Sequence, residues 1–134
     1  MAPIIKISEA ATIAIHTIYL LARNQDRLLS NKELADIMKV SDNHLAKVLQ
    51  RLVKLGLVSS IRGAKGGFKL SKPPSSITLL EIYEYFDGKI DFHSCLLDQP
   101  VCVEGTCMFG HILEDVNKNM VEYMKTKTFD IYIK

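Results

Sequence analysis

Two helix-start signals that lie close together constrain the fold of this chain more than any other feature. The run Ser30-Asn31-Lys32-Glu33 is a capping-box pattern, in which the hydroxyl accepts from a backbone amide one turn ahead and the carboxylate reaches back. Ser41 is a second N-cap, and it follows a short patterned helix that should end near Met38. The sequence therefore predicts two helices joined by a tight turn, the second of which stops at Gly56.

Elements are also predicted on either side of this pair. Between Ser8 and Arg23, apolar residues recur at helical spacing and cover most of the circumference, so this helix should be buried on several sides. After the pair, residues 57–62 and 68–70 have strand character and flank a glycine-rich turn, which predicts a β-hairpin. Pro73-Pro74 should end that unit, because proline cannot donate to a ladder.

The C-terminal part predicts a short and a long helix around an irregular segment. Thr78-Leu79-Leu80-Glu81 is another capping box, and Asp87-Gly88 should end the helix that it starts. No period is visible from Lys89 to Met108, and a long irregular segment in a small domain is usually functional or organised by a ligand. An amphipathic helix from about Phe109 to Lys127 favours pairing with a second copy over capping its own core.

The 134 residues, 48% of them hydrophobic, suffice for one core and are too few for two comfortable ones. We expect a mainly α fold with a small β-hairpin. Residues 1–75 should form a winged helix-turn-helix, and residues 76–134 should hold the irregular segment and a dimerisation helix, packed with the first helix as one unit. The sequence shows no signal peptide and no membrane-spanning run, which predicts a soluble cytoplasmic protein.

Charge is distributed unevenly, although the net charge is only +2. The segment from Lys39 to Lys72 holds eight basic residues against the single acid Asp42. The segment from Ser76 to Met124 holds nine acidic residues and two basic ones. This pattern predicts one phosphate-seeking face and a remainder that avoids phosphate.

The basic segment coincides with the predicted helix pair and hairpin, and this combination indicates DNA. A helix-turn-helix places the start of its second helix at base edges in the major groove, and an arginine on the hairpin can enter a narrow minor groove. The expected contacts, with Arg51 at a phosphate and Arg62 as the principal hairpin contact, are Ser41, Asn43, His44, Lys47, Arg51, Arg62 and Lys65. A basic face that serves a protein partner is the less favoured alternative.

All three cysteines, Cys95, Cys102 and Cys107, lie in the irregular segment. In a reducing compartment, an odd and tightly spaced set favours a ligand or sensor role over a disulfide scaffold. Three thiolates with one harder ligand suit an iron–sulfur centre, and the same donors suit Zn2+. A reversible thiol switch needs only two of them.

The run from Asp42 to Val58 continues through Ser60, Arg62-Gly63 and residues 66–70 to Ile77-Thr78-Leu79 in a highly specific pattern. In this pattern, over nearly the whole chain, the sequence resembles the Rrf2 family of bacterial winged-helix regulators. The resemblance implies a homodimer that binds double-stranded DNA. In many members it also implies a cluster held by three cysteines of the corresponding loop. From the two-fold symmetry of such a dimer we expect a palindromic operator. We expect the regulator to act as a repressor.

Departures from the family pattern bear on the cluster. Members that bind one commonly place five residues in each gap between cysteines, whereas the gaps here hold six and four. In members similar to IscR, a histidine follows the last cysteine after two residues, and here His111 follows after three. In members similar to NsrR, the fourth ligand is a carboxylate from the other subunit's first helix, and Glu9 matches its position. The resemblance thus favours a 4Fe–4S cluster with Glu9 over a 2Fe–2S cluster with His111, and either over zinc or a thiol switch.

No enzyme is expected, since nothing resembles a nucleotide-binding glycine loop, a nucleophile elbow or a carboxylate pair. An iron–sulfur electron carrier is a remote alternative, because it would not need the basic winged helix. His16 and His93 are assigned no role, since a lone histidine is more often structural or solvated. The sequence does not identify the signal among nitric oxide, oxygen, iron supply and redox state.

Overall fold

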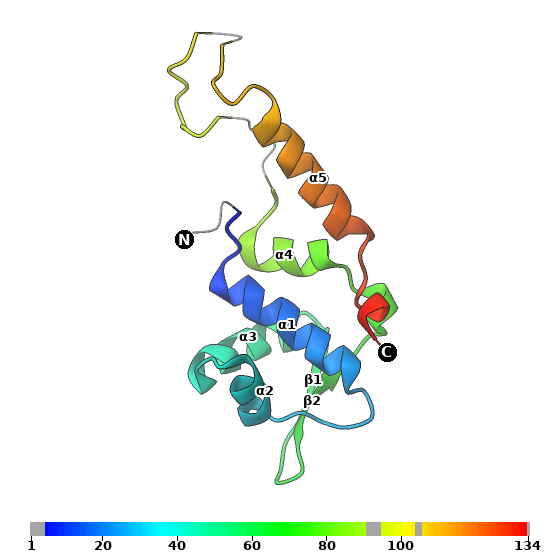
Figure 1. The fold of residues 1–134 in the computed structure, drawn as a ribbon. Helices are drawn as coiled ribbons and strands as arrows, with labels where there is room; N and C mark the ends of the chain where they lie inside the picture. Colours follow the sequence, from blue (N-terminus) through cyan, green and yellow to red (C-terminus); the bar gives the residue numbers. More distant parts are fainter. Residues whose placement is uncertain (1–4, 91–94, 104–105, 134) are drawn as a thin grey trace.

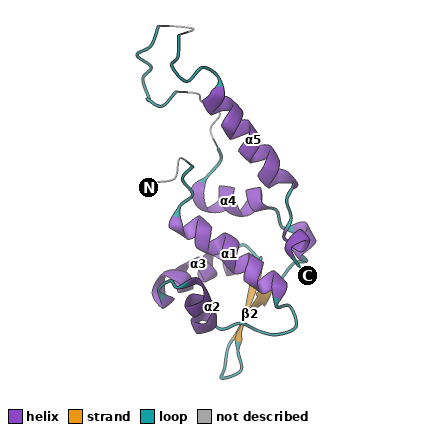
Figure 2. Ribbon diagram, in the orientation of Figure 1, coloured by secondary structure: helices purple, strands orange, loops and turns teal. Residues whose placement is uncertain are grey.

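The computed structural model describes residues 5–90, 95–103 and 106–133. In these ranges the chain forms five α-helices, two short 3-10 helices and one antiparallel hairpin (Figures 1 and 2). In chain order they are α1 (Glu9–Arg23), α2 (Asn31–Met38), α3 (Asp42–Lys54), β1 (Val58–Ile61), β2 (Gly67–Leu70), η1 (Pro74–Ser76), α4 (Leu79–Asp87), α5 (Ile112–Thr126) and η2 (Phe129–Tyr132). His93, which the sequence analysis left without a role, lies outside the described residues.

The helix-turn-helix starts at the predicted caps. The Ser30 hydroxyl accepts from the Glu33 amide at 3.1 Å and the Glu33 carboxylate accepts from the Ser30 amide at 3.4 Å, so the capping box is complete. The Ser41 hydroxyl accepts from the His44 amide at 3.1 Å and so caps α3. Between the two helices, Lys39 adopts a left-handed conformation with φ of 56°, which ends α2. The predicted pair of helices joined by a tight turn is confirmed.

The hairpin forms the predicted wing. Val58 lies opposite Leu70, and Ile61 lies opposite Gly67. The segment before α2 adds a bridge that the sequence did not predict, because the Leu29 amide donates to the Phe68 carbonyl at 3.1 Å and the Phe68 amide donates back at 2.8 Å. The wing is therefore tied by its backbone to the chain that enters the helix pair.

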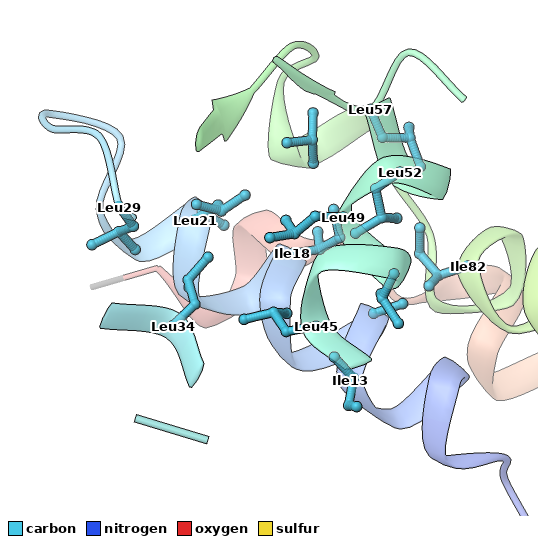
Figure 3. Close-up of a cluster of buried hydrophobic side chains, with 14 of the residues drawn as sticks. Ile13, Ile18, Leu21, Leu29, Leu34, Leu45, Leu49, Leu52, Leu57 and Ile82 are labelled. Atoms are coloured by element: carbon cyan, nitrogen blue, oxygen red, sulfur yellow. The ribbon is translucent and has the colours of Figure 1, made fainter. Parts of the chain in front are cut away.

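One apolar core joins the elements, with α1 at its centre (Figure 3). This helix packs against α2, α3, β2, α4 and η2, which agrees with the prediction that it is buried on several sides. The largest fully buried side chains come from α1 to α4, the segments between them and η2, and they include Ile18, Leu21, Leu29, Leu34, Leu45, Leu49, Leu52, Leu57, Ile77, Ile82 and Phe129. In Figure 1, α5 leads away from this core toward the loop that carries the cysteines.

The C-terminal region differs from the prediction in two ways. The last helix begins at Ile112 rather than near Phe109, because Gly110 has a positive φ of 58° and the preceding residues form turns. After α5 the chain folds back, and Phe129 enters the core with 1% of its surface exposed. Hydrophobic periodicity could not reveal this, because one 3-10 turn is too short to show a period. None of the described helices is long and apolar enough to cross a membrane.

The core position of Leu49 gives a test of this packing. Leu49→Ala should lower the free energy of unfolding by about 2–5 kcal/mol, because the side chain is fully buried and its removal leaves a cavity. Val53→Ala is the matched control on the same helix, since Val53 is 37% exposed and should cost less than about 1 kcal/mol. Urea unfolding followed by circular dichroism at equal protein concentrations measures both. Equal losses at the two positions would contradict the assigned core.

Candidate nucleic-acid interface and cysteine loop

The start of α3 presents the side chains that were predicted to contact bases. Asn43 and Lys47 are exposed, on the side of the helix away from the buried residues Leu45, Val48 and Leu49. Ser41 is also exposed, and its oxygen serves as the cap of α3. Polar groups on an exposed helix start suit hydrogen bonding in the major groove.

His44 has an ion-pair partner that the sequence analysis did not predict. Its Nδ1 atom lies 3.4 Å from Oε1 of Glu9, at the first residue of α1, and the two attract when the imidazole is protonated. A predicted base contact and a predicted cluster ligand are thus neighbours across two helices. Sequence patterns do not carry this information, since it depends on how α1 crosses α3.

Helix α2 is joined to α3 by a side chain that the sequence analysis missed, and a second missed contact ties α2 to the segment before it. The Asn31 amide nitrogen donates to the Asp42 carbonyl at 3.2 Å, which joins the first residues of the two helices. Arg27 pairs with Glu33 at 2.9 Å, and its hydrogen bond is the main reason that the pKa of Glu33 lies below its ordinary value. The asparagine directly after a cap was the only sequence signal for such a brace.

The wing and α3 enclose a surface hollow. It is lined by Asn31, Ala46, Leu49, Gln50, Val53, Lys54, Ser60, Arg62 and Phe68. Arg62 therefore shares one surface with the basic end of α3, and both Arg62 and Lys65 are exposed. The arrangement places a basic wing beside the exposed helix, as contact with two parts of a DNA duplex requires.

Arg51 does not line this hollow and instead contacts α4. Its guanidinium carbon is 4.1 Å from the centre of the Phe86 ring, and its Nη2 donates to the Tyr85 carbonyl at 3.3 Å. This side chain is thus engaged at the junction of α3 and α4. The phosphate contact expected for it remains a prediction.

The three cysteines are free thiols. Cys95 is half-buried and its sulfur accepts a hydrogen bond from the Leu97 amide at 3.4 Å, while Cys102 and Cys107 are exposed. Within residues 5–90, 95–103 and 106–133, no three side chains of His, Cys, Asp or Glu gather closely enough to hold a metal ion. The structure therefore does not bring the cysteines together with either candidate fourth ligand.

The two candidate fourth ligands occupy different settings. The Glu9 side chain is 73% exposed and lies beside the start of α3, whereas His111 is exposed at the turn before α5. In the sequence His111 follows Cys107 closely. Neither side chain is held by packing, so both are free to reorient toward a metal centre.

An apolar groove adjoins the cysteine loop. It is lined mainly by Ile5, Ile7, Tyr83, Ile90, Cys95, Leu96, Phe109, Ile112, Leu113, Val116, Met120 and Met124. Phe109 and Ile112 leave 48% and 54% of their surfaces exposed. Burial, and then the charge of Asp87, raises the pKa of Tyr83 at the inner side of the groove. Contiguous exposed apolar surface of this kind usually marks an interface.

The capped helix pair, the wing and the basic hollow define a winged helix-turn-helix protein that binds DNA. The chain belongs to the Rrf2 family, whose description is iron-dependent transcriptional regulator and whose model matches residues 7–133. This finding confirms the resemblance seen in the sequence.

Individual relatives agree with this membership. The transcriptional regulator NsrR of Bacillus licheniformis is 33% identical, over 80% of this chain and 74% of the relative. Among solved structures, CymR, the global cysteine regulator of B. subtilis, is 26% identical with a TM-score of 0.75 and covers 96% of this chain and 97% of its own. IscR of T. potens is 25% identical with a TM-score of 0.71, and the match covers 95% of this chain and 85% of the IscR chain.

The interface can be tested with Lys47→Ala and Arg62→Ala on a duplex selected from a random library. The first should weaken binding by about 1–3 kcal/mol through the lost major-groove contact. The second should lower the preference for a narrow, A·T-rich minor groove. Fluorescence anisotropy measures both.

Lys125→Ala is the control for these variants, because Lys125 is exposed on the last turn of α5. It should leave affinity and sequence preference unchanged. Wild-type preference in the Arg62 variant would remove the wing from the DNA interface.

Proposed function

We propose that this transcriptional regulator of the Rrf2 family is a homodimeric repressor whose operator binding is controlled by an iron–sulfur cluster at Cys95, Cys102 and Cys107. The observation that carries the proposal is the presence of three free thiols in the loop that connects α4, which adjoins the DNA-reading unit, to α5. A change at the thiols can therefore reach the reader through one connecting helix. A cytoplasmic location and the lack of a catalytic role belong to the same proposal.

The dimer is supported by the apolar groove beside α5. Ile112 and Phe109 expose much of their side chains there, and a second copy of the chain would remove that surface from water. Two readers related by two-fold symmetry would bind an imperfect palindrome, with half-sites about 34 Å or a multiple of that apart.

The cluster is supported by the donor set. Three unpaired thiols and an exposed carboxylate or imidazole are the ligand types that iron–sulfur centres take, and the relatives NsrR and IscR are regulators of the same family. When bound, a cluster with one ligand other than sulfur supplies a redox-active and labile centre. Glu9 as that ligand would leave His44, so ligation and base contact would be linked.

A thiol switch without metal is the second candidate. The structural neighbour CymR is the global cysteine regulator of B. subtilis, and in this chain Cys102 and Cys107 are exposed thiols that an oxidant can reach. Zinc would take the same donors. An electron carrier is disfavoured, since the basic hollow beside the wing would have no use in it.

Replacing a single cysteine tests the cluster. Cys95→Ala, Cys102→Ala and Cys107→Ala should each abolish or sharply reduce bound iron and sulfide in anaerobically purified protein, because each thiol is expected to be a ligand. Iron and acid-labile sulfide analysis with visible absorption measures this. Met108→Ala is the control, since Met108 is exposed beside Cys107 and should keep the cluster. Stoichiometric zinc without sulfide in the wild type would replace the cluster by a zinc site.

The same preparation discriminates between the fourth ligands. Under the favoured arrangement, Glu9→Ala alters the cluster spectrum and its stability, whereas His111→Ala hardly does. The reverse result would favour the 2Fe–2S arrangement with His111.

The groove predicts where the dimer can be broken. Ile112→Glu should weaken the dimer at least tenfold, because it places a charge on the apolar surface that the second copy should cover. Lys125→Glu adds the same charged side chain on α5 outside the groove and should leave the dimer intact. Sedimentation velocity over a range of concentrations measures both. A dimer in which Ile112→Glu has no effect must use another surface.

A further inference from the structure

The last turn of α4 is joined to the last turn of α3 by one arginine. The Arg51 guanidinium carbon lies 4.1 Å from the centre of the Phe86 ring and 5.7 Å from that of Tyr85. Its Nη2 also donates to the Tyr85 carbonyl at 3.3 Å. A stacking contact and a hydrogen bond therefore hold the same group at once.

The contact satisfies a need of α4. The final carbonyls of a helix lack partners within it, and the helix dipole favours a cation there. No residue of α4 supplies one, since its last turn contains no basic side chain. Arg51 supplies both the donor and the charge from α3. Only a planar guanidinium can stack on a ring and donate in this way, which lysine cannot do.

The same turn of α4 also holds the start of α1. Asp87 accepts from the backbone amide of Ser8 at 2.9 Å and from the Ser8 hydroxyl, and Ser8 caps α1. The next residue, Glu9, lies 3.4 Å from His44 at the beginning of α3. One turn of α4 thus reaches α3 at its last turn directly and at its first turn through α1.

We propose that Arg51 is a positioning residue, which sets the orientation of α3 against α4, and that it is not a phosphate contact. The inference deepens the proposed function and rests on operator binding by α3. The Arg51 contact links α3 to the segment that leads to the cysteines, because α4 ends at Asp87 and the chain continues through Gly88 toward Cys95.

Salt dependence separates the two roles of Arg51. The slope of log affinity against log salt concentration is negative, and a lost phosphate contact reduces its magnitude by about 1. A lost positioning contact lowers affinity and leaves the slope unchanged. We expect Arg51→Ala to weaken binding to the selected operator about fivefold to tenfold with the wild-type slope. Lys54 is exposed in the same helix turn and lines the hollow beside the wing, where we expect it to contact a phosphate. Lys54→Ala is therefore the control that should reduce the magnitude of the slope.

Variants of α4 complete the test. Phe86→Leu removes the stacking contact and leaves the hydrogen bond to the Tyr85 carbonyl, so it should weaken binding by no more than Arg51→Ala does. The double variant should bind no more weakly than Arg51→Ala alone, because the stacking contact needs both side chains. Arg51→Lys should not restore binding, because it keeps the charge and loses the stacking. A reduced slope in Arg51→Ala, rescue by lysine, or additive losses with Phe86→Leu would overturn the proposal.

A measurement without DNA keeps this inference distinct from the proposed function. The chain contains no tryptophan, so Phe86→Trp introduces a single tryptophan under Arg51, which can be excited selectively in the presence of the tyrosines. Adding Arg51→Ala should shift its emission to longer wavelength, and Lys54→Ala should not. If the wild type binds no selected operator, the proposed function fails, while the emission still shows whether Arg51 holds α4. An unchanged emission overturns the contact itself.

Discussion

The burial of α1 is the interaction on which the rest of the structure depends. This helix packs against the DNA-reading pair, the wing, α4 and the C-terminal turn, so it joins regions that are far apart in the sequence. Ile18 and Leu21 have almost no exposed surface, and each such side chain contributes about 1.5–3 kcal/mol by leaving water. The reader helix and the helix that leads to the cysteines therefore share one support.

Polar contacts at the ends of α1, α3 and α4 add defined geometry to this apolar packing. Apolar packing alone tolerates small rotations, whereas hydrogen bonds at helix ends have defined geometry. Asp87 binds the cap of α1, Glu9 meets His44, and Arg51 meets the last turn of α4. These contacts lie at the ends of three helices, where backbone groups lack partners within their own helix. Helix α3 thus has polar contacts at both of its ends in addition to its buried face.

Local sequence signals predicted the fold well where the structure depends on neighbours in the chain. The caps at Ser30 and Ser41 and the strands on either side of the glycine turn lie where short-range patterns placed them. The bridge from Leu29 and the burial of Phe129 were missed, because each depends on a partner distant in sequence. The site divides in the same way. Exposure of Asn43 and Lys47 followed from helix periodicity, but the partner of Arg51 was not predictable, since an arginine on a basic helix looks the same whether it meets phosphate or an aromatic ring.

The position of the cysteines has a consequence for how such a protein can change over evolution. Cys102 and Cys107 are exposed, and in Figure 1 the described parts of their loop lie beyond the N-terminal end of α5, away from α1, α2 and α3. We expect changes at these two exposed positions to leave the packing of α1 undisturbed and to cost little folding stability. The chemistry of detection can therefore diverge while the DNA-reading body stays the same. Proteins of one architecture can in this way evolve to respond to different chemical signals while every intermediate variant still folds.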